Sequence, residues 1–383
     1  MNGFNNRTVS LRSAALLIIT SFIFVASCAR KTSKDVVIGV VAPLTGPIAP
    51  YGENIRDGVL LAVDEINKKG GVNGSDIKIV FEDEGGGPQA AVNAVIKLAT
   101  LNKVAAIIGP ATSNGIMATA PFAEANHIVL LTPSGTSDNI REAGDYVFRN
   151  RASATQEASI FAYYIIEDLG INEIAILRAD ADYAVSFADV CKGVIAGNGG
   201  KILTEEVFAE GTTDFRTQLT KIKVASPEGF IIIGVPIELG NILKQSRELG
   251  IRTRMFSNTI DSPEILKIAE GAEEGLSFVT TFYDPVHGDE RTRKFDTRFK
   301  DRFGRASHLF GANAYDAMYI LTDVIRNYGN NGEAIKEGLY EFEGIHGAAG
   351  FTAFDEKGDL RSTRVAVKKI LDGKFVFVKE VQR

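Results

Sequence analysis

Apolar residues alternate between two spacings along most of the chain. The run from Val36 to Val41 is continuous and rich in β-branched residues, which is typical of a strand buried on both faces. The next segment carries Ile55, Val59 and Ile66 at helical spacing. The unit recurs, with predicted strands at 36–41, 77–82, 104–108 and 128–131 and predicted helices at 52–68, 89–101 and 114–125. This alternation predicts βαβ crossovers and a parallel sheet.

A second series begins after Arg149. Its predicted helices cover 155–169, 184–196, 215–223, 238–249 and 263–269, and its predicted strands cover 173–177, 201–207, 230–233, 255–257 and 275–282. Helices at 292–303 and 311–328 follow, and strands 365–372 and 374–381 around Asp372-Gly373 predict a hairpin. The two series predict an α/β protein with two doubly wound, Rossmann-like units.

The N-terminus has the pattern of an export signal. Arg7 and Arg12 precede an apolar run from Ala14 to Ala26, which at about 13 residues is short for a membrane-spanning helix. The pattern therefore predicts a signal peptide over residues 1–27 that ends in a lipid-attachment site, with an uncleaved anchor or a plain secretory signal as the alternatives. Residues 25–28, Val-Ala-Ser-Cys, resemble a bacterial lipobox, which implies lipid attachment at Cys28 and a tether over 28–34.

Composition and charge exclude several protein classes. The chain has 383 residues, 45% of them apolar, and a net charge of −6 that becomes −8 without residues 1–27. These values exclude a disordered or disulfide-scaffold chain and argue against nucleic-acid binding. If Cys28 carries lipid, Cys191 has no partner within the chain. Cys191 shares a predicted helix face with Phe187 and Ile195, so we expect a buried, inert thiol.

Catalytic motifs are missing from the sequence. The four histidines, His127, His287, His308 and His346, lack metal-ligand spacing, and we expect surface or packing roles for them. Gly85–Gly87 lacks the Lys and spacing of a phosphate loop and is interpreted as a flexible turn. The neighbouring acids, Glu82 to Glu84, are interpreted as a solvated strand end. We therefore expect no enzyme, metal or cofactor.

Hydroxyl residues gather where two predicted strands end. Strand 104–108 leads to Thr112-Ser113, and strand 128–131 leads to Ser134 and Thr136. Ligands of open parallel sheets bind beyond the carboxyl ends of the strands. There, Ser113 and Thr136 would join the free amides of a helix N-terminus to make a carboxylate site. The alternative is that both residues are helix caps or turn residues.

The order of several motifs resembles one known family. The segments are IGVVAPLTGPIAPYG (38–52), AVDEINKKGGVNG (62–74), IIGPATS (107–113), LLTPSGT (130–136) and FDEKGDL (354–360). Together, behind a lipobox, they resemble the leucine/isoleucine/valine-binding family of bacterial extracytoplasmic solute-binding proteins, which have the type I periplasmic binding fold. The resemblance runs from about Val36 to the C-terminus.

The resemblance implies two lobes joined by three chain crossings, with a ligand between them. Residues 35–153 and 285–350 would form one lobe, and 154–284 and 351–383 the other. By matched position, the hydroxyls of Ser113 and Thr136 would hold a ligand carboxylate, and Ser134 falls where a backbone carbonyl takes the ligand ammonium. Tyr51 and Tyr183 match aromatic residues that line the cleft from opposite lobes.

One segment departs from the family pattern. Where members that bind amino acids place an acid against the ligand ammonium, this chain has Asn258 or Thr259. Asp261 is explained as a helix N-terminal cap, and Glu238 as a solvated helix-start residue that is also a candidate substitute. An ammonium buried without an acid is poorly compensated. We therefore expect a carboxylate without an α-amino group, or a neutral polar solute.

The implied function is solute capture. A lipid-anchored receptor would bind an amino acid, a related carboxylate or an amide and deliver it to the membrane permease subunits of an ABC importer. A periplasmic sensory module that uses the same cleft to signal through a partner is the alternative. An extracytoplasmic enzyme is disfavoured, because no set of nucleophile, base and orienting residue can be assembled.

Overall fold

Two β-sheets organise the chain from Val36 onward. The structure is a computed structural model that describes Met1 and residues 35–85, 87–258 and 261–382. Cys28 and Thr259, both singled out above, lie outside the described residues. Among the helices that are described, none is both long and apolar enough to cross a membrane.

The first sheet is parallel, with strand order β2-β1-β3-β4-β5. Its strands are β1 (Val36–Ala42), β2 (Ile77–Asp83), β3 (Ala106–Ile108), β4 (Val129–Thr132) and β5 (Val147–Arg149). The helices packed with it are α2 (Ala49–Lys68), α3 (Pro88–Lys97), α4 (Ser113–Asn126), α10 (Glu290–Phe303), α11 (Leu309–Tyr328) and α12 (Gly332–Tyr340). Helices α2 and α11 come so close that a Cβ atom at Gly58 would lie 2.1 Å from the carbonyl oxygen of Gly311.

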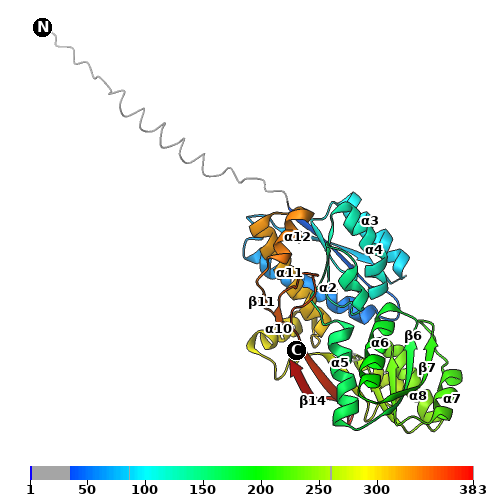
Figure 1. Cartoon of the computed structure of the whole chain (residues 1–383). Coiled ribbons are helices and arrows are strands. Elements are labelled where there is room, and N and C mark those ends of the chain that lie inside the picture. The colour runs from blue at the N-terminus through cyan, green and yellow to red at the C-terminus, as the bar shows by residue number, and fades with distance from the viewer. Residues whose placement is uncertain (2–34, 86, 259–260, 383) are drawn as a thin grey trace. The chain divides into compact units, whose positions relative to one another are not determined.

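Both faces of this sheet are covered, which explains the continuous apolar run of β1. Ile38 and Val40 join the core that includes α2 and α11, whereas Val41 joins the core that includes α3 and α4. Figure 1 shows α3 and α4 together on one side of the sheet, away from α2. Alternate residues of β1 therefore enter two different cores, as its period of two dictates.

The second sheet has seven strands in the order β14-β13-β10-β9-β8-β6-β7. Its strands are β6 (Glu173–Ala179), β7 (Lys201–Phe208), β8 (Gly229–Ile233), β9 (Arg254–Ser257), β10 (Ser277–Thr281), β13 (Arg364–Leu371) and β14 (Lys374–Gln382). Its helices are α5 (Ala154–Tyr163), α6 (Asp182–Gly197), α7 (Arg216–Ala225), α8 (Pro236–Glu248) and α9 (Pro263–Ala269). A small sheet pairs β11 (Ile345–His346) with β12 (Phe351–Thr352).

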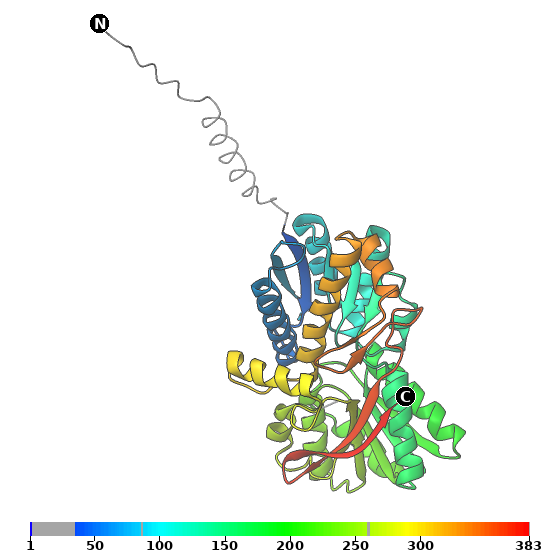
Figure 2. The ribbon, with the colours of Figure 1, turned by 90° about the vertical axis from the view of Figure 1, so that its left-hand side faces the viewer.

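The C-terminal hairpin extends this sheet. Strand β13 pairs antiparallel with β10 and with β14, and Figure 2 shows the two red strands running side by side. Asp372 and Gly373 both have positive φ, 50° and 66°, which the tight turn between the strands requires. The predicted hairpin is confirmed. The predicted burial of Cys191 is confirmed too. Its side chain is fully buried in the hydrophobic core around the second sheet, and burial raises the pKa of its thiol.

Some elements escape the sequence prediction. The sequence pattern predicted neither strand β5 nor helix α12, because three strand residues and a nine-residue helix give too short a periodic signal. Helix α3 ends at Lys97 and is followed by one π-helical turn over Leu98–Asn102, where a single helix was predicted.

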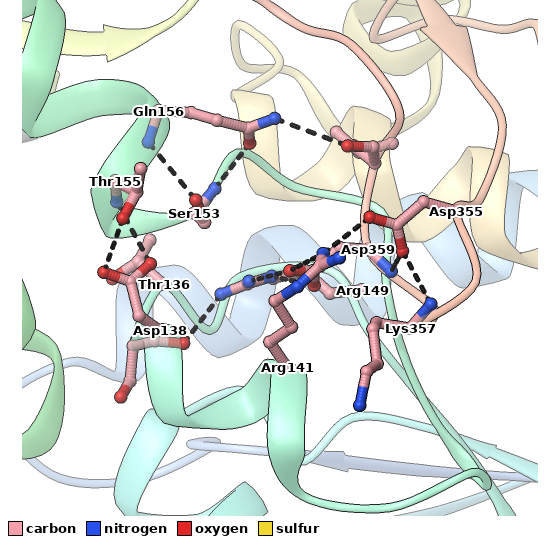
Figure 3. Close-up of polar contacts among 12 residues, drawn as sticks. Thr136, Asp138, Arg141, Arg149, Ser153, Thr155, Gln156, Asp355, Lys357 and Asp359 are labelled. Atoms are coloured by element: carbon pink, nitrogen blue, oxygen red, sulfur yellow. Dashed lines mark hydrogen bonds and ion pairs between the residues drawn. The ribbon is translucent and has the colours of Figure 1, made fainter.

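Buried ion pairs hold the chain where it passes from one sheet to the other. Arg149, at the end of β5, is fully buried and donates from Nε and Nη2 to the two carboxylate oxygens of Asp359, at 2.9 and 2.7 Å. Figure 3 shows Arg149 beside Asp359. The Nη1 of Arg149 donates to the carbonyl oxygen of Ser137. Farther along, Arg151 pairs with Glu157, which also accepts from the amide and hydroxyl of Thr281. Segments distant in sequence are thus fixed to one another at these passages.

Candidate functional site

The two segments rich in hydroxyl residues, which follow strands β3 and β4, contact each other in the structure. Helix α4 begins at Ser113, and its cap is the preceding residue, Thr112, whose hydroxyl accepts from the amide of Gly115. The Ser113 hydroxyl oxygen instead accepts from the amides of Thr136 and Ser137, at 3.2 Å each. Ser113 is therefore not a helix cap. It joins the carboxyl end of β3 to that of the neighbouring strand β4.

Ser134 and Thr136 are held by further bonds to the backbone. The Ser134 hydroxyl donates to the carbonyl oxygen of Ala111 at 2.7 Å. The carbonyl oxygen of Thr136 accepts from the amide of Ala154, at the start of α5. The segment that carries both hydroxyls is thus fixed against the β3–α4 loop on one side and α5 on the other.

Glu84 lies behind this junction and corrects a prediction. It was expected in a solvated strand end, yet it is only 2% exposed. Its carboxylate accepts from the amide of Ala111 at 2.6 Å and from the hydroxyl of Thr112 at 2.9 Å. Burial raises the pKa of Glu84 to about 7, although the bonds from Ala111 and Thr112 oppose the shift. Glu84 therefore supports the loop that leads into α4.

Tyr51 belongs to an aromatic group at the start of α2. Its ring packs on His308 at a centroid distance of 5.9 Å and on Phe310 at 4.8 Å. Burial raises the pKa of the Tyr51 hydroxyl; the charge of Arg151 opposes this shift, and the charges of Glu264 and Asp261, which follow β9, add to it. The Tyr51 hydroxyl is thus close to residues of the second sheet's loops.

His308 has a role that the sequence did not indicate. Its Nδ1 accepts from the amide of Phe310, and its Nε2 lies 3.1 Å from the carbonyl oxygen of Asp261. Burial lowers the pKa of His308 to about 4, so the ring is neutral at pH 7 and donates from Nε2. His308 was expected to be a surface or packing residue; its ring does pack on Tyr51 and Phe310, and it is also a partly buried helix cap that links α11 to the segment after β9. Its position directly before the apolar helix α11 was the sequence feature that could have indicated the capping role.

Between β9 and α9, the described residues include one acid, Asp261, and its carboxylate is ion-paired. The Asn258 side-chain oxygen accepts from the amide of Gly234 at 3.1 Å. The predicted capping role of Asp261 is wrong, because α9 starts after Ser262 and the Asp261 carboxylate pairs with Lys368 of β13. The pairing explains the difference, since Lys368 is distant in sequence and nearly buried.

Glu238 also differs from its prediction. Expected to be solvated, it is 2% exposed, and its two carboxylate oxygens accept from the amides of Gly211 and Val235. Burial raises its pKa, while these two bonds oppose the shift. It caps α8 and fixes the loop after β7.

Polar contacts join α4 and its neighbours to α6. The Asn114 side-chain oxygen accepts from the amide of Asp182 at 2.9 Å, and its nitrogen lies 3.4 Å from a carboxylate oxygen of Glu210. The hydroxyl oxygens of Ser137 and Ser186 are 3.1 Å apart. Tyr183, the residue after Asp182, lies in the first turn of α6, and its hydroxyl is buried without a hydrogen-bond partner among the described residues.

A separate cavity lies among the crossing segments. Its lining includes Asn150, Thr281, Tyr283, Leu360 and Thr363. None of the residues predicted to bind ligand lines it, so the candidate site is defined by the contacts around Ser113 and not by this cavity.

Comparison with known proteins identifies the family. Residues 35–374 match the periplasmic binding protein family. The chain belongs to this family. A leucine-, isoleucine-, valine-, threonine- and alanine-binding protein of Pseudomonas aeruginosa is 29% identical over 330 residues, covering 85% of this chain and 87% of the relative.

Solved structures of periplasmic binding proteins agree with this assignment. The leucine-binding protein LivK of Thermotoga maritima has a TM-score of 0.85 at 28% identity and covers 90% of this chain and 98% of its own. The branched-chain amino acid transporter substrate-binding protein LivJ of Streptococcus pneumoniae, in complex with isoleucine, has a TM-score of 0.84 at 26% identity and covers 91% and 100%.

The comparisons confirm three predictions from the sequence and the coarser part of a fourth, the location of the protein. The resemblance to leucine/isoleucine/valine-binding proteins holds, and the α/β fold is that of the type I periplasmic binding proteins. The relatives are solute-binding proteins and not enzymes. Membership of a periplasmic binding protein family implies an extracytoplasmic location.

Proposed function

We propose that this protein is an extracytoplasmic solute-binding lipoprotein of the branched-chain amino acid type. It captures a small carboxylate or amino-acid-like solute and delivers it to the permease subunits of an ABC importer. The observation that carries the proposal is the junction of Ser113 with the segment of Thr136 at the N-terminus of α4.

This junction can bind a carboxylate through hydroxyl and amide donors, without a Lys or Arg side chain. The N-terminus of α4 presents amides with a partial positive charge. The hydroxyls of Ser113 and Thr136 donate to the carboxylate, and the Ser113 oxygen releases the Thr136 amide, which becomes a further donor. Such charge-assisted hydrogen bonds are stronger than bonds between neutral groups.

Capture uses two lobes, formed by residues 35–153 with 285–350 and by residues 154–284 with 351–383. Tyr51 contributes from the first lobe, and Tyr183, Asn258 and Thr259 contribute from the second. Ser134 offers its backbone carbonyl to a donor group on the solute. A solute that contacts both lobes stabilises the closed arrangement, because only that arrangement makes both sets of contacts.

Names of the relatives support the transport role. The structural neighbour from Streptococcus pneumoniae is described as a transporter substrate-binding protein, and the Pseudomonas relative as an amino-acid-binding protein. The lipobox-like residues before Cys28 support a lipid anchor that keeps the receptor at the membrane where the permease subunits lie.

The double variant Ser113→Ala with Thr136→Ala tests the binding site. Loss of two hydroxyl bonds to a charged group, each contributing about 1.5 kcal/mol or more, weakens binding at least about 100-fold. Titration calorimetry with a solute found by a thermal-shift screen of amino acids, keto and hydroxy acids, aromatic acids and amides measures the loss.

A matched control removes two hydroxyls elsewhere. Among the described residues, the hydroxyls of Thr100 and Ser226 bond to the nearby carbonyls of Ile96 and Lys223, so Thr100→Ala with Ser226→Ala leaves affinity unchanged. Equal affinity of the Ser113/Thr136 variant and the wild type contradicts the site assignment. Absence of a thermal shift with every solute in the screen contradicts the proposed function itself.

A further inference from the structure

One cavity touches each of the three passages by which the described part of the chain runs between its two large sheets. The passages lead from β5 to α5, from β10 to α10, and from α12 through β11 and β12 to β13. The cavity is lined from the first by Asn150, from the second by Thr281 and Tyr283, and from the third by Leu360 and Thr363. Its volume is about 80 Å³, and one water molecule needs about 10–15 Å³. The cavity therefore has room for several water molecules or for one compact solute.

The side chain of Asn150 points to a ligand in this cavity. Asn150 is only 2% exposed, and its Nδ2 donates to the carbonyl oxygen of Asn313 at 2.8 Å. This bond fixes the orientation of the side-chain amide, because only the nitrogen can donate. The buried Oδ1 has no hydrogen-bond partner among the described residues, which is costly for an acceptor. Since Asn150 lines the cavity, a molecule bound there can supply the missing donor.

Two buried threonines of the lining also present acceptors. The Thr281 hydroxyl donates to Glu157 at 2.8 Å, and the Thr292 hydroxyl donates to the carbonyl oxygen of Ala348 at 2.8 Å. A hydroxyl has a single proton, so each of these oxygens can only accept from a molecule in the cavity. The lining therefore fits a molecule that donates hydrogen bonds.

The charges of the lining favour a neutral molecule. Asp289 is the acid and Arg364 the base among the described lining residues. The Asp289 carboxylate accepts from the amides of Arg291 and Thr292, and Arg364 pairs with Glu380. Because a buried ion needs a close partner of opposite charge, and both lining charges already have partners, a neutral molecule fits better than an ion. Asp289 and Arg364 are exposed, so the cavity can be reached from solvent.

We propose that this cavity is a second binding site, which takes a neutral hydroxyl donor, either water or a small diol. The donor bonds to Asn150 Oδ1 and to the Thr281 oxygen, and so joins the first passage to the second. The Phe282 amide already joins the second passage to the third, by donating to the carbonyl oxygen of Arg364 at 2.7 Å. Such bonds restrain the passages, where rotation between two units of a protein is absorbed. No described residue of the proposed solute site lines this cavity, so either proposal can fail without the other.

Crystal structures of the wild type test the site directly and separate the two sources of the hydroxyl. One set of crystals is grown without polyols, and a second set is soaked in ethylene glycol. In the first set we expect ordered water within hydrogen-bond distance of Asn150 Oδ1. In the second set, a diol in place of this water identifies a diol site, and unchanged water identifies water as the occupant. Crystals of the first set without ordered density at this position overturn the proposal, and a diol seen only after soaking is then binding at crystal concentration only.

Asn150→Leu tests whether the bound molecule joins the passages. Leu has a similar size but no acceptor, so we expect the density beside residue 150 to disappear. We also expect hydrogen–deuterium exchange of the Phe282 amide, measured by mass spectrometry, to become about threefold faster. The direct bond of Asn150 goes to Asn313 in α11, so a change at Phe282 reports the bridge between passages.

Asn126→Leu is the matched control, because within the described residues its side chain bonds to the carbonyl of Phe122 in the same helix. We expect exchange at Phe282 to be unchanged in this variant. Density that persists in Asn150→Leu, or equal exchange at Phe282 in Asn150→Leu and the wild type, overturns the bridging role. If Asn150→Leu does not fold, the wild-type crystals still decide whether the site exists.

Discussion

Glu84 is a buried carboxyl group placed directly behind the proposed carboxylate site. The two residues before it, Glu82 and Asp83, are acids, and this local pattern suggested solvent exposure. The loop that covers it is 27 residues away, where Ala111 and Thr112 donate to its oxygens. Burial of a single residue by a distant loop leaves no periodic signal, which is why sequence reasoning missed it.

The raised pKa of Glu84 has a consequence for stability. Because its pKa in the folded protein, about 7, exceeds the ordinary value of 4.5, the folded state holds the proton more tightly. The stabilisation of the folded state by this proton is complete below about pH 4.5 and is lost as the pH rises to about 7. Glu84→Gln has no proton to lose at this position. Raising the pH from 5 to 8 therefore lowers the free energy of unfolding of the wild type by about 2 kcal/mol more than that of the variant.

Urea unfolding of both proteins at pH 5 and pH 8 measures this difference. Asp316 is a second buried carboxyl group with a pKa raised to about 7 by burial. The stability of Glu84→Gln therefore still depends on pH through Asp316. Asp316→Asn removes that remaining dependence. A stability difference between Glu84→Gln and the wild type that is the same at both pH values would mean that Glu84 does not titrate in this range.

At the scale of elements, β5 and the turn at 355–360 are joined by a buried ion pair. Arg149 is fully buried against Asp359, while nearby Arg141 contacts Asp355 and the exposed Glu356 (Figure 3). Removing one partner of a buried pair leaves an uncompensated charge, whereas exposed pairs contribute little. The buried pair of Arg149 with Asp359 therefore contributes more to stability than the exposed pair of Arg141 with Glu356, although both involve the same turn.

Asp359→Asn is expected to lower the free energy of unfolding by about 3 kcal/mol or more, because Arg149 stays buried with its charge unpaired. Glu356→Gln is the matched control: the Glu356 side chain is 79% exposed, and we expect a change below about 0.5 kcal/mol. Denaturant unfolding at pH 7 measures both. Similar small changes in the two variants would mean that Arg149 finds another partner or reaches solvent.

At the scale of the whole molecule, local patterns predicted the architecture but not the long-range pairs. The two strand–helix series and the Asp372-Gly373 hairpin are local signals, and they appear in the structure. The meeting of Ser113 with Thr136 followed from the rule that parallel strands end at one edge. The pairing of Asp261 with Lys368 and the bond from His308 to Asp261 depend on folding, because their partners are far apart in sequence.

Contacts between α4 and the loops of the second sheet add a conformational prediction. Asn114 bonds to the Asp182 amide and approaches Glu210, so it links the proposed lobes without any ligand. In a two-state receptor, apparent affinity depends on the population of the closed state. A cross-lobe hydrogen bond of about 1 kcal/mol therefore contributes to affinity even though it does not touch the solute.

Asn114→Ala removes this link, and we expect about fivefold weaker solute binding with an unchanged midpoint of thermal unfolding in the absence of ligand. Calorimetry measures the affinity, and small-angle X-ray scattering of the ligand-free protein is expected to give a larger radius of gyration. Asn126→Ala is the control, because Asn126 lies at the other end of α4 and, within the described part of the chain, its side chain bonds to the carbonyl of Phe122 in the same helix. Unchanged affinity and radius of gyration in Asn114→Ala would show that these contacts do not favour closure, and that closure depends on the solute alone.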